Sequence, residues 1–174
     1  HRMRVRQEEP VRPGDTVHGY RIERKLGAGG FGKVYLARQE ERPYALKFLH
    51  LKEAGEWAKR ELSILLHLVH PNVVRLSDFG QDDSGLLYIA MELLEGDSLE
   101  QILDAGPIAA EQAVQLTLPI VEALAVAHHA GVVHRDIKPS NIVISEQPDG
   151  TLQPKLLDFG IAKSQNAGLP LKLT

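Results

Sequence analysis

The sequence predicts an α+β fold from three observations. Short β-prone runs, separated by glycine-rich or charged turns, follow one another through the first half of the chain, as in an antiparallel meander. Stretches with the apolar spacing of α-helices interrupt and follow these runs. Hydrophobic residues make up 43% and charged residues 25% of the 174 residues, which is typical of a globular domain or of a piece of a larger one.

Charge and composition argue against several function classes. The formal net charge of −3 does not suit a nucleic-acid binder, because phosphate contacts require a basic surface. The chain has no cysteine, so it has no disulfide, thiolate metal site or thiol nucleophile, which fits a cytoplasmic location. No apolar run is long enough to span a membrane, and we expect no secretion signal. This segment implies no membrane contact, although an anchor elsewhere in a longer chain remains open.

The first elements are predicted as follows. Residues 1–18 mix Arg, Glu, Pro and Gly without periodicity, which predicts a flexible leader, with a docking arm as the alternative. Strands follow at 20–25, 34–38 and 43–49. A helix is predicted at 56–68, where an apolar stripe is formed by Trp57, Ala58, Leu62, Leu65 and Leu68.

The second half begins after two more predicted strands at 73–80 and 86–91. A Gly-Asp-Ser sequence at 96–98 is a start signal for a short helix. A long helix is predicted at 107–130. It is apolar almost all round, so we expect it to be buried on nearly every side and kinked at Pro119. The strand-like runs 142–145 and 155–157 flank a Pro-Asp-Gly turn and predict a hairpin.

Gly27, Gly29 and Gly32 form the pattern G-x-G-x-x-G. A dinucleotide-binding fold would need a helix directly after these glycines, whereas residues 33–37 alternate as a strand does. The glycines therefore join two strands. This suits a flap over nucleotide phosphates and equally an ordinary glycine-rich hairpin, so the glycines alone leave both interpretations open.

Lys47 favours the phosphate interpretation. Strand alternation puts Lys47 on the face of Ala45, opposite Leu46 and Phe48. Glu61 lies on the helix stripe that faces the sheet, where a carboxylate needs a cation. We therefore predict a Lys47–Glu61 ion pair that holds the lysine against phosphate oxygens.

The strongest motif is HRDIKPSN at residues 134–141. H-R-D-x-K-x-x-N fixes five residues, so a chance match is on the order of one in three million per position. With this motif and the stretches GYRIERKLGAGGFGKVYLA and HRDIKPSNIVI, the chain resembles the eukaryotic-like Ser/Thr protein kinases of bacteria. The resemblance implies a two-lobed α+β protein-kinase fold, with a complete N-terminal lobe at 19–95 and only the first part of the C-terminal lobe at 96–174.

The resemblance also implies roles for individual residues. Gly27, Gly29 and Gly32 would cover the phosphates of ATP, and Lys47 with Glu61 would hold the α- and β-phosphates. Asp136 would accept or orient the proton of the substrate hydroxyl, and Lys138 would neutralise the γ-phosphate. Magnesium would bind Asn141 and Asp158, the latter from the Asp-Phe-Gly sequence at 158–160. The adenine slot would be formed by Val34, Ala45, the gatekeeper Met91, the backbone of Glu92 and Leu94, and Val143.

Two features near these motifs need separate interpretation. A second Asp-Phe-Gly at 78–80 lies before the catalytic loop in a strand-like run, and we interpret it as a strand end with a turn glycine. The chain stops at Thr174, inside the implied activation segment, so we expect a longer polypeptide. Arg135, directly before Asp136, implies a segment ordered by phosphate, with Thr174 as the candidate phosphosite and a site beyond residue 174 as the alternative.

The implied function is that of an ATP- and Mg²⁺-dependent protein kinase that transfers the γ-phosphate to Ser or Thr hydroxyls. The expected partners are ATP and a protein substrate, and no nucleic acid. The alternative is a non-catalytic nucleotide-binding or scaffolding module. A small-molecule phosphotransferase is a third possibility, and Arg135 and Lys138 weigh against it.

Overall fold

The computed structural model describes residues 9–29, 32–50, 56–81, 85–157 and 159. The first part, which we call the N-terminal lobe, contains β1 (Thr16–Val17), β2 (Tyr20–Gly29), β3 (Gly32–Gln39), β4 (Arg42–His50), α1 (Glu56–His67), β5 (Leu76–Gln81) and β6 (Leu86–Glu92). Its strands form one sheet in the order β1-β2-β3-β4-β6-β5, and every pairing in it is antiparallel. The predicted meander is therefore confirmed.

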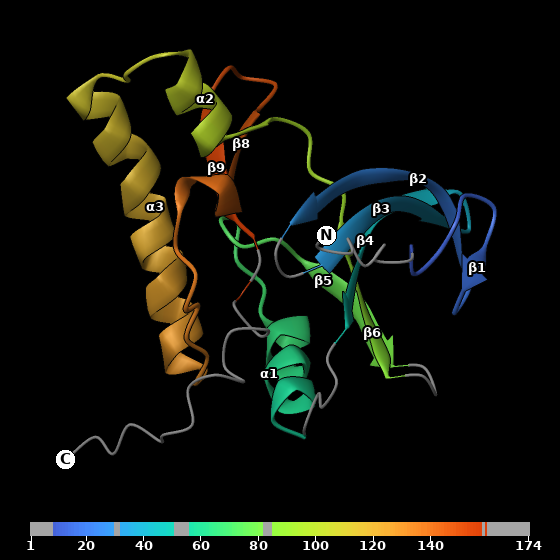
Figure 1. The fold of residues 1–174 in the computed structure, drawn as a ribbon. Coiled ribbons are helices and arrows are strands. Elements are labelled where there is room, and N and C mark those ends of the chain that lie inside the picture. The colour runs from blue at the N-terminus through green and yellow to red at the C-terminus, as the bar shows by residue number, and fades with distance from the viewer. Residues whose placement is uncertain (1–8, 30–31, 51–55, 82–84, 158, 160–174) are drawn as a thin grey trace, which may run out of the picture.

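The second part, the C-terminal lobe, contains β7 (Asp97–Ser98), α2 (Leu99–Ala105), α3 (Ala110–His129), a 3-10 turn at Pro139–Asn141, β8 (Ile142–Glu146) and β9 (Leu152–Leu156). Its strands form a small sheet in the order β7-β8-β9. Figure 1 shows α2, α3 and the β8–β9 hairpin on one side, the large sheet on the other, and α1 between them. The fold is thus the two-lobed α+β arrangement expected from the sequence.

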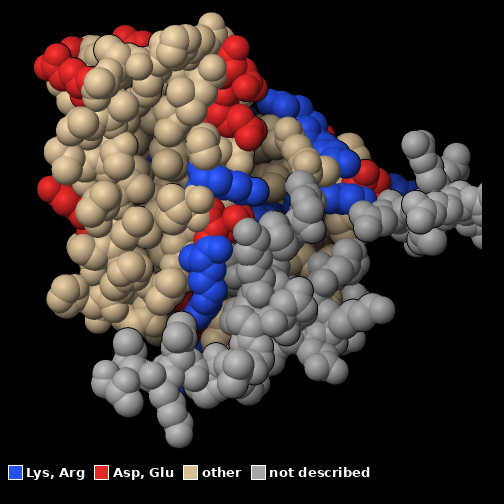
Figure 2. Space-filling view, turned by 60° about the vertical axis from the view of Figure 1, so that its left-hand side comes forward, with Lys and Arg blue, Asp and Glu red and all other residues tan. Residues whose placement is uncertain are grey.

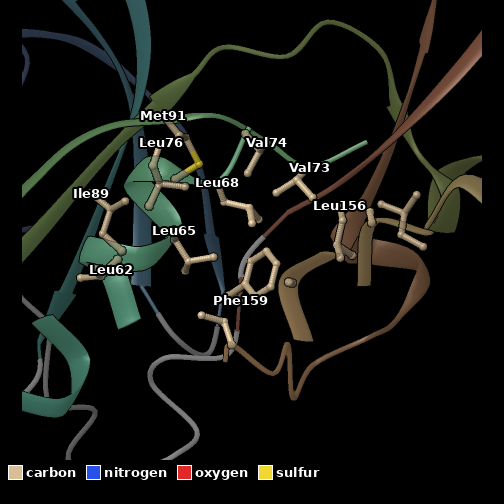
Figure 3. Packing of buried hydrophobic residues seen from close by; sticks show 14 of the residues in the cluster. Leu62, Leu65, Leu68, Val73, Val74, Leu76, Ile89, Met91, Leu156 and Phe159 are labelled. Atoms are coloured by element: carbon tan, nitrogen blue, oxygen red, sulfur yellow. The ribbon is translucent and has the colours of Figure 1, made fainter. Parts of the chain in front are cut away.

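Two apolar clusters occupy the two faces of the large sheet. The inner cluster joins α1, β4 and β6 to α3, β8, β9 and Phe159. Figure 3 shows Leu62 and Leu65 of α1, and Leu68 directly after it, directed into this cluster, as their helical spacing predicts. The outer cluster contains Tyr20, Tyr35 and Phe48. The inner cluster is continuous between the lobes, so it holds them together.

The flexible-leader prediction is wrong for residues 9–18. Val11 is only 7% exposed and packs in the outer cluster. The Gly14 amide donates to the Ile22 carbonyl and the Ile22 amide to the Asp15 carbonyl, each at 2.8 Å. The physical reason is the aromatic outer face of the sheet, which would otherwise meet water. The segment 9–18 is therefore the docking arm that the sequence left as an alternative.

The residues that the structure describes bury the long helix along one side only, whereas the sequence analysis expects burial on nearly every side in a longer polypeptide. The buried residues of α3 form one stripe, made of Leu116, Ile120, Ala123 and Ala127. Val114, Leu118 and Val121 on its other side are exposed by 55%, 57% and 54%. In Figure 2 this side of the molecule is a broad face almost without charge. The helix continues through Pro119.

The connection between α1 and β5 is hydrogen-bonded to the C-terminal lobe. The Asn72 side-chain amide donates to the Pro154 carbonyl at 2.8 Å, across 82 residues of sequence. The Leu156 amide donates to the Asn72 carbonyl at 2.8 Å, and the Val74 amide donates to the Leu156 carbonyl at 3.0 Å. Val73 and Leu156 form an isolated parallel bridge. The two lobes are thus joined by backbone bonds as well as by apolar packing.

Among the described residues, none of the helices is both long enough and apolar enough to cross a membrane.

Candidate active site

His134 braces the loop that follows α3. Its side chain is 1% exposed, and its ring lies 4.7 Å from that of Phe159. The Asp136 amide donates to Nδ1 at 3.1 Å, so Nδ1 is an acceptor. Nε2 then carries the proton and donates to the Leu157 carbonyl at 2.6 Å. A neutral His134 therefore links the HRD sequence to the segment directly before Asp158.

Asp136 lies in this loop with its carboxylate fixed. Nδ2 of Asn141 donates to the Asp136 carbonyl at 2.8 Å and to Oδ2 of the same residue at 3.1 Å. Nζ of Lys138 lies 3.8 Å from that Oδ2. Asp136 and Asn141 are both buried, while Lys138 is exposed. The loop thus presents a fixed carboxylate beside a cation with more freedom to move, which suits proton acceptance next to an anionic group.

Glu61 is the point at which the structure contradicts the sequence prediction. Its carboxylate is buried on α1, as its place on the apolar stripe predicts. However, Nη1 of Arg135 donates to its two oxygens at 2.9 and 3.0 Å. The predicted Lys47–Glu61 ion pair is wrong for this conformation, because among the described residues the cation paired with Glu61 is Arg135. A buried carboxylate needs a cation, but its place on the helix does not decide which of two nearby cations it takes.

Trp57 lies one helical turn before Glu61 and covers the same guanidinium. The Cζ atom of Arg135 is 5.2 Å from the centre of the Trp57 ring, within the range of a cation–π contact. Arg135 itself has φ of +63°, a conformation uncommon for a residue with a side chain. Such a conformation persists only where the surroundings fix it. The contacts with Glu61 and Trp57 supply that constraint.

The glycines lie on β2 and β3, which pair as an antiparallel hairpin. At Gly32, φ is +152° and an added Cβ would lie 2.4 Å from the Phe48 carbonyl oxygen, so no other residue fits there without a shift. At Gly27, by contrast, no atom of the described residues other than its chain neighbours lies within 4 Å of the place of a Cβ. Val34 pairs with Lys47 in the sheet, so these two side chains share a face. The hairpin and Lys47 therefore border one region, as a phosphate site requires.

Four of the predicted adenine-slot residues belong to the inner cluster or pack against it. Ala45 and Met91 are paired across β4 and β6, and both belong to the inner cluster. Val34 and Leu94 pack against that cluster, and Val143 is half-buried in β8. These positions come from both lobes, which fits a site between them.

Glu92 is anchored at the junction of the lobes. Its Oε1 accepts hydrogen bonds from the Arg75 amide at 2.9 Å and from Lys155 Nζ at 2.7 Å. Its own amide donates to the Arg75 carbonyl at 3.0 Å. Lys155 comes from β9, so the ion pair crosses from one lobe to the other. Lys155 was not predicted, and its alternation within β9 was the only signal that could have indicated it.

Asp78 is held within the sheet and away from the motif it imitates. It lies in β5, and its Oδ2 accepts the Tyr88 hydroxyl proton at 2.9 Å. Burial, followed by this hydrogen bond, raises the pKa of Tyr88, so the hydroxyl remains a donor. An added Cβ at Gly80 would lie 2.7 Å from the Tyr88 ring. The 78–80 sequence thus has a packing role in the strand.

Asp158, Gly160 and Thr174 lie outside the described residues, so the predicted second magnesium ligand and the candidate phosphosite are not placed. Within the described ranges no group of three or more His, Asp and Glu side chains could hold a metal ion. Asn141, the other predicted ligand, lies in the described part of the chain. The two side-chain hydrogen bonds of Asn141 described above come from Nδ2, and its Oδ1 is an oxygen of the type that magnesium prefers.

Comparison with known proteins agrees with this fold. The chain matches the protein kinase domain family over residues 20–172, and it belongs to that family. It is 42% identical over 151 residues to the serine/threonine-protein kinase pkn2 of Myxococcus xanthus, covering 83% of this chain and 18% of the relative. It is 41% identical over 162 residues to PknJ of Mycobacterium tuberculosis, covering 87% of this chain and 27% of the relative. The chain therefore spans less than a third of the length of these relatives.

Solved structures are similar as well. The kinase domain of PknI from Mycobacterium tuberculosis superposes with a TM-score of 0.81 at 29% identity, covering 94% of this chain and 70% of that one. Rad53 in complex with AMP-PNP superposes with a TM-score of 0.73 at 32% identity, covering 82% of this chain and 38% of that one. The protein-kinase fold expected from the sequence is thus confirmed.

Proposed function

We propose that this chain is the nucleotide-binding and catalytic-loop part of a protein kinase that transfers the γ-phosphate of ATP to Ser or Thr hydroxyls of a protein. The observation that carries the proposal is the fixed Asp136 carboxylate, bonded to Asn141 and 3.8 Å from Lys138. The similarity of the chain to bacterial Ser/Thr kinases supports Ser and Thr hydroxyls as the acceptors. ATP as donor is supported by family membership and by the similarity to the AMP-PNP complex.

In this proposal Asp136 orients the acceptor hydroxyl and takes its proton. The hydroxyl oxygen attacks the γ-phosphorus, the bond from that phosphorus to the β,γ-bridging oxygen breaks, and ADP leaves with the bond's electron pair. The Asp136 carboxylate and the γ-phosphate are both negatively charged, and Lys138 reduces the repulsion between them. Magnesium, held by Asn141 and Asp158, would neutralise phosphate charge when bound. The glycine hairpin and Lys47 would hold the phosphates in line with the hydroxyl.

The proposal requires Glu61 to change partner. With Glu61 bonded to Arg135, the lysine clamp on the α- and β-phosphates lacks the carboxylate that orients it. We therefore propose that phosphotransfer occurs in an arrangement in which Glu61 leaves Arg135 for Lys47. This same observation favours the second candidate, a non-catalytic nucleotide-binding module in which the Glu61–Arg135 pair persists.

Transfer of radiolabel from γ-labelled ATP to a generic basic protein, measured beside ATP binding, separates the two candidates. We expect transfer by the complete kinase domain and its loss in Asp136→Asn, with ATP binding retained. Nucleotide binding without transfer in the complete domain would support the non-catalytic module instead. The same assay tests Lys47→Met, which we expect to lose more than nine tenths of the transfer rate.

A further inference from the structure

One carboxylate outside the matched kinase region joins the two strands that carry the glycines. Oε1 of Glu9 accepts a hydrogen bond from Lys25 Nζ on β2 at 2.8 Å. Its Oε2 lies 3.5 Å from Lys33 Nζ on β3 and accepts the hydroxyl proton of Tyr35, also on β3. Residue 9 precedes the match to the kinase family, which begins at residue 20. Three donors from two strands therefore meet one side chain of the docking arm.

These donors lie next to the phosphate-binding hairpin. Lys25 is two residues before Gly27, and Lys33 directly follows Gly32. Lys25 and Tyr35 are partners across the β2–β3 ladder. Side chains alternate along a strand, so Lys33 and Tyr35 face one side while Val34, with its partner Lys47, faces the other. Glu9 thus connects the two strands from the face opposite the predicted nucleotide site.

The arm that carries Glu9 is itself fixed. Val11 is buried between the arm and the sheet, and the Arg12 amide donates to Oδ2 of Asp15 at 2.8 Å, which closes a turn. Hydrogen bonds from Lys25 and then from Tyr35 lower the pKa of Glu9 to about 2. The carboxylate is therefore ionised at any pH at which a kinase is assayed.

We propose that Glu9 is a positioning residue for the phosphate-binding hairpin, an inference that rests on the proposed function. Glycines give the hairpin more conformational freedom than other residues would, and that freedom must be lost when phosphates bind. A carboxylate that bonds to both strands removes part of it beforehand. Nucleotide phosphates then meet a hairpin that is already in place, which strengthens their binding.

The sign of the effect separates this role from simple electrostatics. Glu9→Gln removes one negative charge beside two lysines, so charge alone would attract the phosphates of ATP more strongly. Loss of positioning has the opposite consequence and weakens ATP binding. Adenosine has no phosphates to meet the glycines, and its predicted contact with the hairpin is Val34 of β3, so its binding should depend less on the position of the hairpin than ATP binding does.

The test is the dissociation constant of Mg-ATP and of adenosine, measured by calorimetry on the full chain. Glu9→Gln is expected to raise the Kd of ATP roughly three- to tenfold and to raise that of adenosine by a smaller factor. Tyr35→Phe keeps the buried ring and removes only the hydroxyl, so a smaller shift in the same direction is expected. The matched control is Glu23→Gln, because Glu23 forms a 2.8 Å ion pair with Arg38 on the same two strands, away from the glycines. We expect this control to bind both ligands as the wild type does.

Unchanged or tighter ATP binding in Glu9→Gln would overturn the inference, and so would equal losses in Glu9→Gln and Glu23→Gln. A wild-type chain that binds neither ATP nor adenosine would contradict the proposed function itself. In that case hydrogen exchange still tests whether Glu9 positions the hairpin, since the amides of Gly27 and Gly32 should exchange faster in Glu9→Gln than in Glu23→Gln. Equal exchange in the two variants would overturn it.

Discussion

The cation that neutralises Glu61 decides what the candidate site can do. The family resemblance implies that Lys47 is the partner of this carboxylate. The observed partner is Arg135. The structure pairs it with Arg135, through one guanidinium nitrogen and both carboxylate oxygens. Because a carboxylate 7% exposed cannot be left without a cation, a change of partner must be an exchange rather than a simple release.

Removal of Arg135 is therefore expected to destabilise the fold. Arg135→Ala leaves the Glu61 carboxylate without its partner in this arrangement, which should lower the free energy of unfolding by about 1–3 kcal/mol. The control is Arg38→Ala, whose pair with Glu23 is more exposed and should contribute about 1 kcal/mol or less. Urea unfolding of the two variants measures both values. Equal losses would show that the Arg135 contact contributes no more than an exposed ion pair.

The sequence could place Glu61 but not choose its partner. Helical periodicity puts Glu61 on the buried face of α1, and the structure confirms that burial. The choice of Arg135 depends on the unusual backbone conformation of that residue and on the Trp57 ring beside it. Both are tertiary features that no local pattern encodes.

The helix α2 begins with a capping box. The Gln101 amide donates to Ser98 Oγ at 3.2 Å, and the Ser98 amide donates to Gln101 Oε1 at 2.8 Å. Ser98→Ala should therefore cost about 1 kcal/mol of stability. In Ser63→Ala the lost hydroxyl donates to the Lys59 carbonyl within α1, and alanine has the better helix propensity, so that variant should be neutral or slightly more stable. Thermal unfolding compares the two, and a larger loss in Ser63→Ala would contradict this account.

The Lys155–Glu92 ion pair fixes the residue whose backbone is predicted to meet adenine. Lys155→Ala should weaken adenosine and ATP binding by the same factor, roughly three- to tenfold, because both ligands share the adenine ring. Gln153→Ala changes the neighbouring residue on the same face of β9 and should leave both affinities unchanged. Calorimetry with the two ligands gives the comparison. A loss confined to ATP would instead connect Lys155 with the phosphates.

Local patterns predicted most elements because each has strong local signals. The predicted strand 34–38 appears as β3 (Gly32–Gln39), and the predicted helix 56–68 appears as α1. The pattern at 9–18 gave no such signal, since that segment is held by Val11 and by bonds to β2. The two-residue β7 was not predicted either, because it exists only through its pairing with β8. Elements stabilised by distant partners were therefore the ones missed.

The exposed side of α3 departs from an ordinary protein surface. Val114, Leu118 and Val121 are each more than half exposed on one helix. Contiguous apolar surface of this kind promotes association. We expect the 174-residue chain by itself to associate as its concentration rises.

Leu118→Gln combined with Val121→Gln should reduce this association by removing apolar surface without changing the net charge. Thr117→Gln is the control, because it exchanges one exposed polar residue for another on the same helix. Sedimentation velocity over a range of concentrations measures the effect. Association that is equal in all three proteins would show that this side of α3 is not the surface involved.

The bonds of Asn72 also have a consequence for the order of folding during synthesis. Asn72 and Pro154, which share a hydrogen bond, are 82 residues apart in sequence. On the ribosome, the side-chain amide and the carbonyl of Asn72 therefore lack these partners until β9 has emerged. The N-terminal lobe should thus remain incomplete at this connection after all of its own strands have been made. Long-range closure of this kind slows folding.

A nascent chain arrested before residue 154 has left the exit tunnel should accordingly be cleaved by protease near Asn72. A chain arrested well after residue 156 has left the tunnel should resist cleavage there.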